Sequence, residues 1–240
     1  MQAETEKGRI KGPFARPPLR GFVVLPLNTV PKSDSTDRRV IVDLSWPRGR
    51  SVNTGIEVDS YQGEPVDVQY PSVDEIIALV NFHGRGCHIF KRDMRAAYRK
   101  FPVHPDDYHL LGYFWNGLFY HDTVLLMGQR SAAMACQRTT RAVVFIMNAE
   151  GATIVVYLDD FIGVAIKSMA AEQFARLAIL LHEMRLDENV PKAKDPATQH
   201  IVLGDYVRYG GNDNFCYSGA FRGDRYLDIA LAEEAFMHEA

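Results

Sequence analysis

Apolar and polar residues along this chain follow two patterns, one typical of strands and the other of helices. Short runs rich in β-branched and aromatic residues, bounded by turn formers, predict strands. They are residues 22–30, 38–44, 87–90, 108–115, 118–126, 152–156, 161–166 and 201–207. Longer segments with apolar residues three and four apart predict helices. They are residues 73–80, 131–148 and 169–186. The mixture predicts an α+β fold in which helices back an antiparallel sheet.

Local signals mark where several of these elements begin and end. Ser72 precedes the first predicted helix and Glu75 follows three residues later, a capping-box signature. Asn116 and Gly117 separate two strand-like runs, which predicts a tight hairpin. Residues 1–20 place glycines and prolines among basic side chains, and we expect an extended arm there rather than a core element.

Composition narrows the class of protein. The chain has 240 residues, 47% hydrophobic and 24% charged, as in an ordinary soluble globular protein. It has no apolar run of about eighteen residues that would predict a membrane span, and residues 1–7 lack a signal-peptide pattern. Cys87, Cys136 and Cys216 have no zinc-ligand spacing and indicate a reducing compartment. We therefore expect an intracellular protein, cytoplasmic or nuclear, with no membrane partner.

Charge is unevenly distributed along the chain. The net charge of −3 by itself argues against nucleic-acid binding. However, residues 1–52 carry ten Lys and Arg against five Asp and Glu, and residues 91–150 carry eight against five. A basic first quarter is typical of a surface that contacts a nucleic-acid backbone, although an ordinary solvated surface accounts for the same charges.

Two adjacent carboxylates, Asp159 and Asp160, lie between two apolar runs that read as buried strands. Like charges this close resist joint ionisation, and burial resists it further. A divalent metal removes the conflict, because hard oxygen ligands suit Mg²⁺ and Mn²⁺. The alternative is a plain hairpin turn, since Asp favours turns. A metal site therefore needs a third carboxylate at another strand end.

Asp93 is the candidate for that third carboxylate, because it ends the apolar run that starts at Cys87. Residues 94–98 predict a tight turn into a helix, whose backbone N–H groups suit a triphosphate. Carboxylates from a strand and a hairpin can bridge two metal ions about 3.5–4 Å apart, as in-line nucleotidyl transfer requires. Without Asp159 and Asp160, a helix N-cap would explain Asp93 better.

These motifs resemble, in this order, the palm motifs of reverse transcriptases. The motifs are Asp93 with Tyr98, Gly128 within residues 125–132, and Tyr157-Leu158-Asp159-Asp160. The similarity is closer still to the polymerases of DIRS-type, tyrosine-recombinase retrotransposons. Three passages carry that closer match: Lys11-Gly12-Pro13-Phe14, residues 40–45 with Ser51-Val52-Asn53, and residues 102–112. The resemblance extends from about residue 8 to about residue 207.

The resemblance implies a role for each matching residue. Asp93, Asp159 and Asp160 would be catalytic and would bind two Mg²⁺ or Mn²⁺ ions. The residues implied to bind the incoming nucleotide are Lys32, Arg39, Met94, Arg95, Ala96, Ala97, Tyr98, Met127, Gly128 and Lys192.

Within the nucleotide-binding set, the resemblance distinguishes individual tasks. Lys32 and Arg39 would hold the β- and γ-phosphates, and Tyr98 would be the aromatic gate beside the sugar. Gly128 would let the backbone approach the template–nucleotide pair closely. Lys192 would lie near the leaving pyrophosphate, with Lys194 as its rival and a solvated lysine as the plainer alternative for either. Arg38, Lys91 and Arg92 would be surface or template-backbone residues.

The resemblance also implies an architecture: the fingers and palm of a right-hand polymerase, with an antiparallel palm sheet backed by helices and no recognisable thumb. We expect a basic arm at 1–20, a fingers-like segment at 21–85, a palm at 86–210 and an atypical tail at 211–240. A second fingers segment near 100–125 would interrupt the palm. A thumb or RNase H domain would be supplied elsewhere.

The function so implied is that of an RNA-directed DNA polymerase. It would add dNTPs to a primer 3′-hydroxyl on an RNA or DNA template by a two-metal mechanism. One alternative is a truncated or domesticated relic that binds nucleic acid without catalysis. Another is a different two-metal palm enzyme such as a nucleotide cyclase, against which Lys32 and Arg39 argue.

Overall fold

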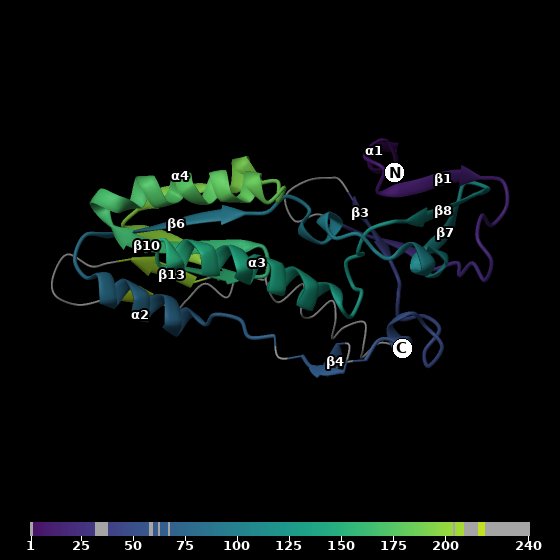
Figure 1. Cartoon of the computed structure of the whole chain (residues 1–240), viewed down its shortest axis with the longest axis horizontal. Helices are drawn as coiled ribbons and strands as arrows, with labels where there is room; N and C mark the ends of the chain where they lie inside the picture. The colour runs from purple at the N-terminus through teal and green to yellow at the C-terminus, as the bar shows by residue number, and fades with distance from the viewer. Residues whose placement is uncertain are drawn as a thin grey trace. The chain divides into compact units, whose positions relative to one another are not determined.

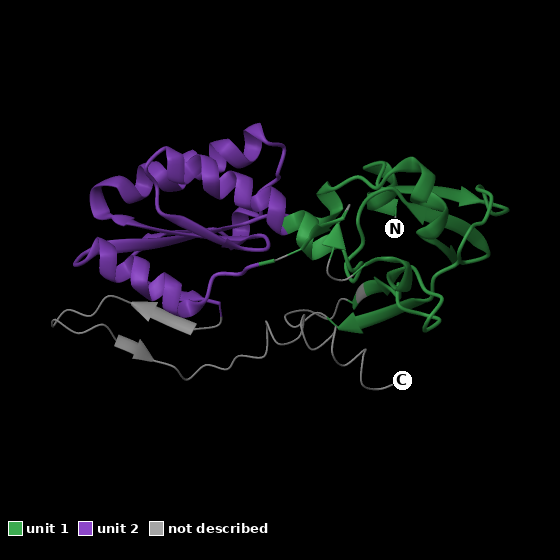
Figure 2. Ribbon diagram, turned by 60° about the horizontal axis from the view of Figure 1, so that its bottom comes forward, with its two compact units in different colours: residues 1–68, 96–136 green, residues 69–95, 137–240 purple. Residues whose placement is uncertain are grey.

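Two compact units make up this chain in a computed structural model, and each unit is assembled from two separate stretches of sequence (Figure 2). Unit 1 comprises Met1–Val68 and Ala96–Cys136, and unit 2 comprises Gln69–Arg95 and Gln137–Ala240. The structure describes residues 2–31, 38–57, 60–61, 63–66, 68–203, 205–208 and 216–218.

Unit 1 contains a three-stranded antiparallel sheet, in the order β1-β8-β7, and two small hairpins. Its strands are β1 (Ile10–Phe14), β2 (Leu27–Pro31), β3 (Arg38–Val42), β4 (Ser60–Tyr61), β5 (Glu64–Pro65), β7 (Gly112–Trp115) and β8 (Leu118–Asp122). Its short helices are α1 (Gln2–Glu6), η1 (Asn53–Gly55), η2 (Ala97–Lys100) and η3 (Pro105–Leu110). One buried cluster in this unit consists of Leu25, Leu44, Leu111 and Leu126.

The N-terminal residues differ from the prediction of an extended arm over 1–20. Residues 2–6 form α1, and β1 pairs with β8 with Ile10 opposite Asp122. Ile10 is buried, so β1 contributes to the core of unit 1. The arm prediction is therefore wrong for this stretch: its glycines and prolines obscured a short apolar strand whose partner lies more than a hundred residues away.

Unit 2 contains a four-stranded antiparallel sheet in the order β11-β6-β10-β9, with helices on both faces (Figure 1). Its strands are β6 (Cys87–Asp93), β9 (Ile154–Tyr157), β10 (Asp160–Ile166) and β11 (Lys194–Ala197), followed by a second sheet of β12 (Gln199–Val202), β13 (Asp205–Arg208) and β14 (Cys216–Ser218). Its helices are α2 (Val73–His83), α4 (Lys167–Glu183) and η4 (Val190–Lys192), and α3 (Ala132–Ala149) lies mostly in this unit. In the described part of the chain, no helix is long and apolar enough to cross a membrane.

Alternation along β6 sends its side chains to opposite faces of the sheet. Cys87 and Ile89 pack in a buried cluster with Ile76 and Val80 of α2. Phe90 lies on the other face, where its ring makes an edge contact with a phenylalanine of α4. Asp93 therefore shares the face that α2 covers, since it is an even number of residues from Cys87 and Ile89.

Phe90 also explains the glycine at position 163 of β10. Gly163 lies directly opposite Phe90 in the antiparallel ladder. A Cβ at Gly163 would lie 2.1 Å from Phe90 Cζ, far inside van der Waals contact. The missing side chain lets the phenylalanine ring cross over β10, which holds the two central strands in close packing beneath α4.

Most predicted elements are present, with shifted boundaries. The capping box of Ser72 and Glu75 is formed at the start of α2. The predicted strand over 108–115 begins only at Gly112, because Pro105 starts the 3₁₀ helix η3. The predicted fingers-like segment, 21–85, includes α2. In the structure, α2 packs instead on the sheet of unit 2. Most of the predicted tail, and with it the prediction concerning a thumb, lies outside the described residues.

Candidate active site

The hairpin between β9 and β10 places two adjacent carboxylates at one end of the sheet in unit 2. Tyr157 and Asp160 are the last opposed pair of the hairpin, so Leu158 and Asp159 form its turn. Leu158 has φ of 54°, in the left-handed region that non-glycine residues avoid. Such a backbone persists only where surrounding contacts hold it, which makes those contacts part of the site.

Asp93 lies at the same end of the sheet. It ends β6 and is directly opposite Asp160, the first residue of β10. The backbone N–H of Met94 donates to the carbonyl oxygen of Asp159, with an N···O distance of 3.1 Å. Strand pairing and this hydrogen bond therefore bring together the three aspartates that the sequence singled out, from segments far apart in the chain.

These carboxylates disfavour one another's ionisation. Burial raises the pKa of Asp159, and the charges of Asp93 and Asp160 raise it further, whereas Lys192 lowers it. Burial likewise raises the pKa of Asp160, and the nearby charge of Lys91 opposes that effect. The end of the sheet is therefore a place where added positive charge is stabilising.

Two nitrogen donors already contact one oxygen of Asp93. Lys192 Nζ lies 2.8 Å from Asp93 Oδ2, and Asn189 Nδ2 donates to the same oxygen at 3.3 Å. The hydrogen bond to Asp93 raises the pKa of Lys192, and the charges of Asp160 and Asp159 add to this rise. Over the residues described, no group of three or more His, Cys, Asp and Glu side chains is arranged to hold a metal ion.

Gln137 of α3 holds the hairpin turn from the helix side. Its side chain is buried, its Oε1 accepts from the backbone N–H of Leu158 at 2.7 Å, and its Nε2 donates to the carbonyl oxygen of Val156 at 3.0 Å. Nε2 also reaches the carbonyl oxygen of Gln69 at 3.3 Å. Sequence reasoning missed this residue, although a long polar side chain on the apolar stripe of a helix was a usable signal.

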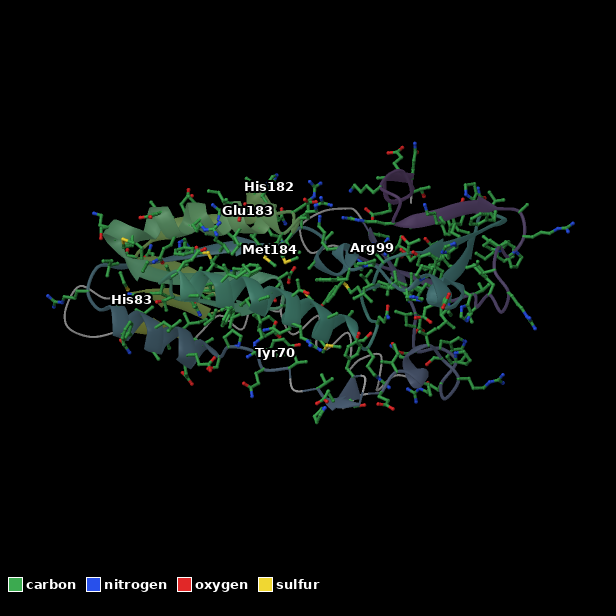
Figure 3. The ribbon with its side chains drawn as sticks, in the orientation of Figure 1. Tyr70, His83, Arg99, His182, Glu183 and Met184 are labelled. Atoms are coloured by element: carbon green, nitrogen blue, oxygen red, sulfur yellow. The ribbon has the colours of Figure 1, made fainter. Side chains whose placement is uncertain are left out.

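An aromatic pair lies on the β9 side of the same turn. The ring of Tyr157 lies 4.7 Å from the ring of Tyr70, centroid to centroid, with 35° between their planes. Tyr70 belongs to the segment that leads into α2 (Figure 3). This segment and α3 therefore both contact the strand that leads into the turn.

The segment after Asp93 has the tight turn that the sequence predicted. Met94 is buried, and the backbone N–H of Arg95 donates to a carbonyl oxygen at residue 187. Ala96 has φ of 53°, and the 3₁₀ helix η2 then begins at Ala97 and includes Tyr98. Ala96, Ala97 and Tyr98 belong to unit 1, whereas Met94 and Arg95 belong to unit 2.

Other predicted nucleotide-binding residues also belong to unit 1. Lys32 lies outside the described residues, and only the backbone of Arg39, in β3, is described. Met127 is 42% exposed. Gly128 has φ of 88°, and its carbonyl oxygen accepts from Asn53 Nδ2 at 2.9 Å.

Asn53 connects two passages that carried the sequence resemblance. It is buried, and its Nδ2 also donates to Ser45 Oγ at 2.9 Å. Its Oδ1 accepts from the backbone N–H of Arg130 at 3.0 Å. One amide side chain thus fixes the loop around Gly128 against the loop that follows β3.

No family model and no curated protein matches this sequence. The fold is nonetheless similar to solved structures. A foamy viral protease-reverse transcriptase in complex with double-stranded DNA has a TM-score of 0.66 at 15% identity, over 85% of this chain and 32% of that one. The prototype foamy virus enzyme, as a CSH mutant, gives 0.63 at 20% identity, over 88% and 25%. A foamy viral enzyme with an RNA/DNA hybrid gives 0.61 at 17% identity, over 86% and 25%.

This chain has a reverse-transcriptase-like fold. Its helices and antiparallel sheets resemble the fingers and palm region of such an enzyme. It spans only about a quarter to a third of the length of the three foamy viral chains. The likeness concerns the path of the backbone, since sequence identity is 20% or less in all three.

One expectation about the charged residues beside the site is wrong. The sequence resemblance predicts Arg92 at the surface or on a template backbone, yet Arg92 is 8% exposed and forms an ion pair with Glu188. Its guanidinium lies 3.6 Å from the ring centroid of Phe174 in α4. Arg92 alternates with Asp93 along β6, so its side chain enters the layer between the sheet and α4.

Proposed function

We propose that this chain is a reverse-transcriptase-like polymerase domain that adds dNTPs to a primer 3′-hydroxyl under the direction of a template. One observation carries the proposal: Asp93 is directly opposite Asp160 at the end of the sheet, and Asp159 lies in the adjoining turn. The reverse-transcriptase-like fold supports it.

The chemistry of the donors at this sheet end suits Mg²⁺ or Mn²⁺, since they are mutually repelling carboxylates with hard oxygen atoms, and we propose that two such ions bind there. Asp93, Asp159 and Asp160 would hold them, and Lys192 would leave Asp93 Oδ2 when they bind. Such ions activate an attacking hydroxyl and neutralise a leaving pyrophosphate. Once Lys192 had left Asp93, its ammonium would still lie beside the site and could contact the departing phosphates.

The remaining residues implied by the sequence resemblance take roles that suit their chemistry. We assign nucleotide binding to Lys32, Arg39, Met94, Arg95, Ala96, Ala97, Tyr98, Met127, Gly128 and Lys192. Cations at Lys32 and Arg39 would offset the charge of the β- and γ-phosphates. The ring of Tyr98 would exclude a 2′-hydroxyl by its bulk.

We further propose that the chain is related to DIRS-type retrotransposon polymerases and that it acts inside the cell, in cytoplasm or nucleus. Its partners would be an RNA or DNA template with a primer. Two of the similar solved structures contain double-stranded DNA or an RNA/DNA hybrid, which supports this choice. Residues 21–85 and about 100–125 would act as fingers and the rest of 86–210 as palm, with a thumb or RNase H domain supplied elsewhere.

Primer extension on poly(rA)–oligo(dT) tests the proposal. We expect incorporation of dTTP that requires Mg²⁺ or Mn²⁺ and that falls to background in Asp159→Asn. The matched control is Asp195→Asn, which removes the charge of an exposed aspartate in the same unit and should leave incorporation unchanged. If the wild-type chain binds the template but shows no metal-dependent incorporation, the proposed polymerase activity is wrong.

A catalytically inactive, nucleic-acid-binding relic is the second candidate, and one observation favours it. Lys192 and Asn189 contact Asp93, and within the described residues no group of three or more His, Cys, Asp and Glu side chains is arranged for a metal ion. For a relic we expect template binding that Mg²⁺ does not strengthen and that Asp159→Asn does not alter. The extension assay and a filter-binding assay on the same template separate the two functions.

A further inference from the structure

The segment at residues 187–192 runs beside the end of β6 and is joined to it by the backbone. The N–H of Arg95 donates to the carbonyl oxygen of Asp187, with an N···O distance of 2.7 Å. The N–H of Asn189 donates to the carbonyl oxygen of Asp93 at 2.8 Å. These two hydrogen bonds fix the backbone of the segment beside the end of β6. The side chains of the segment therefore begin at a fixed position relative to the Asp93 carboxylate.

Asn189 contacts Asp93 twice. Besides the backbone hydrogen bond, Asn189 Nδ2 donates to Asp93 Oδ2 at 3.3 Å. Lys192 contacts the same oxygen, but its side chain is 69% exposed and reaches the site through a flexible stem. An amide donor carries no charge, so Asn189 can keep its contact when a cation approaches the carboxylate, whereas the ammonium of Lys192 is repelled.

A buried ion pair holds the same segment from the opposite face of the sheet. The pair joins Arg92, the residue before Asp93, to Glu188, the residue before Asn189. The two side chains are 9% and 12% exposed. Arg92 Nε also donates to the carbonyl oxygen of Phe174 at 2.8 Å. Removing either charge leaves the other buried without its partner, so the pair links 187–192 to β6 and α4 together.

We propose that Asn189 is a positioning residue for the Asp93 carboxylate, and that the Arg92–Glu188 ion pair is the anchor that holds Asn189 and Lys192 at the end of β6. The proposal rests on the proposed polymerase function for its catalytic consequence. It also has two physical consequences, in metal affinity and in backbone protection, that do not depend on polymerase activity.

Mn²⁺ titration of the full chain, followed by electron paramagnetic resonance, tests the role of Asn189. Residues that orient a metal ligand change metal affinity by about 10–100-fold when they are replaced, and we expect a weakening in this range for Asn189→Leu. Gln199→Leu is the control, because Gln199 is an exposed amide on β12. The proposal is overturned by equal Mn²⁺ affinity in Asn189→Leu and wild type, or by a wild-type chain that binds no Mn²⁺.

Primer extension distinguishes a role of Asn189 in positioning Asp93 for catalysis from a merely structural role. Asn189→Leu should lower kcat by about the same factor as the metal affinity at limiting Mn²⁺, with the KM for dTTP unchanged, and excess Mn²⁺ should restore part of the loss. If the wild-type chain extends no primer while Asn189→Leu still loses Mn²⁺ affinity, the proposed function fails and the positioning role stands. An unchanged kcat alongside weakened Mn²⁺ binding would overturn the catalytic consequence.

Amide hydrogen exchange tests the anchor. In Arg92→Met we expect exchange at the Asn189 amide to accelerate about tenfold or more, because the unpaired Glu188 charge draws the segment toward water. Arg92→Met combined with Glu188→Met removes both charges and should restore much of the protection. Arg176→Met is the control, since Arg176 of α4 pairs with Glu150 and Glu183 at the surface, away from residues 187–192. Equal exchange at Asn189 in Arg92→Met and wild type would overturn the anchor, as would a uniform acceleration throughout unit 2.

Discussion

Replacement of Gln137 by Met tests whether one buried amide holds the turn that carries Asp159. Met has nearly the volume of Gln, so the change removes hydrogen bonds with little cavity cost. The N–H of Leu158 loses its acceptor, and the carbonyl oxygens of Val156 and Gln69 each lose a donor. A buried polar group left unsatisfied costs about 1–3 kcal/mol. Because two of these three bonds are only partly buried, we expect a loss of about 2–4 kcal/mol in the free energy of unfolding.

The assay must follow unit 2. Both tryptophans, Trp46 and Trp115, belong to unit 1, so fluorescence reports on that unit. Urea unfolding followed by far-ultraviolet circular dichroism, together with hydrogen exchange at the Leu158 amide, reports on the turn. The control is Arg141→Met on the exposed face of the same helix. We expect this variant to change the free energy by less than about 0.5 kcal/mol.

Activity gives a second measure of the same change. If Gln137 fixes the turn, Gln137→Met should lower primer extension by about 10–100-fold at a temperature where the protein stays folded, because misplacement by about 1 Å can cost that much. A variant that unfolds within about 0.5 kcal/mol of the wild type and protects the Leu158 amide equally would refute the reasoning.

Three further changes test the packing, a cap and a buried carboxylate. Gly163→Ala should lose about 1–3 kcal/mol in urea unfolding because its Cβ would meet Phe90 at 2.1 Å, whereas Gly55→Ala, with open space around it, should stay within about 1 kcal/mol of the wild type. Ser72→Ala removes the capping box of α2 and should cost about 1 kcal/mol in the same assay. Burial raises the pKa of Asp122 to about 6, so its contribution to stability is complete below about pH 4 and is lost as pH rises through 6. Across that range the wild type should lose about 3 kcal/mol relative to Asp122→Asn in unfolding measured at a series of pH values, and parallel pH profiles would contradict this.

Local chemistry made several elements predictable. The capping box at Ser72 fixes the start of α2 because both of its hydrogen bonds lie within one helical turn. The hairpin at Asn116 and Gly117 follows from their tolerance of positive φ, and both have it. These predictions needed no knowledge of distant residues.

Contacts between distant residues account for what the sequence did not reveal. Residues 10–14 form a strand because a partner strand lies at 118–122, and no local signal announces that pairing. Asn189 reads as an ordinary turn residue, and nothing near it in sequence indicates that it contacts Asp93. Arg92 looks like a surface cation until Glu188 supplies its buried partner. In each case the deciding partner is far along the chain, so a local pattern carries no information about it.

The candidate site divides in the same way. The sequence by itself singled out Asp93, Asp159 and Asp160 and placed each at or beside the end of a strand, because strand-like runs border them. Only the tertiary structure decided the register that puts Asp160 opposite Asp93 and that brings Lys192 to Asp93 Oδ2. Side chains alternate between the two faces of a sheet, so a slip of one residue would turn Asp160 to the α4 side, and the packing of both faces excludes that slip.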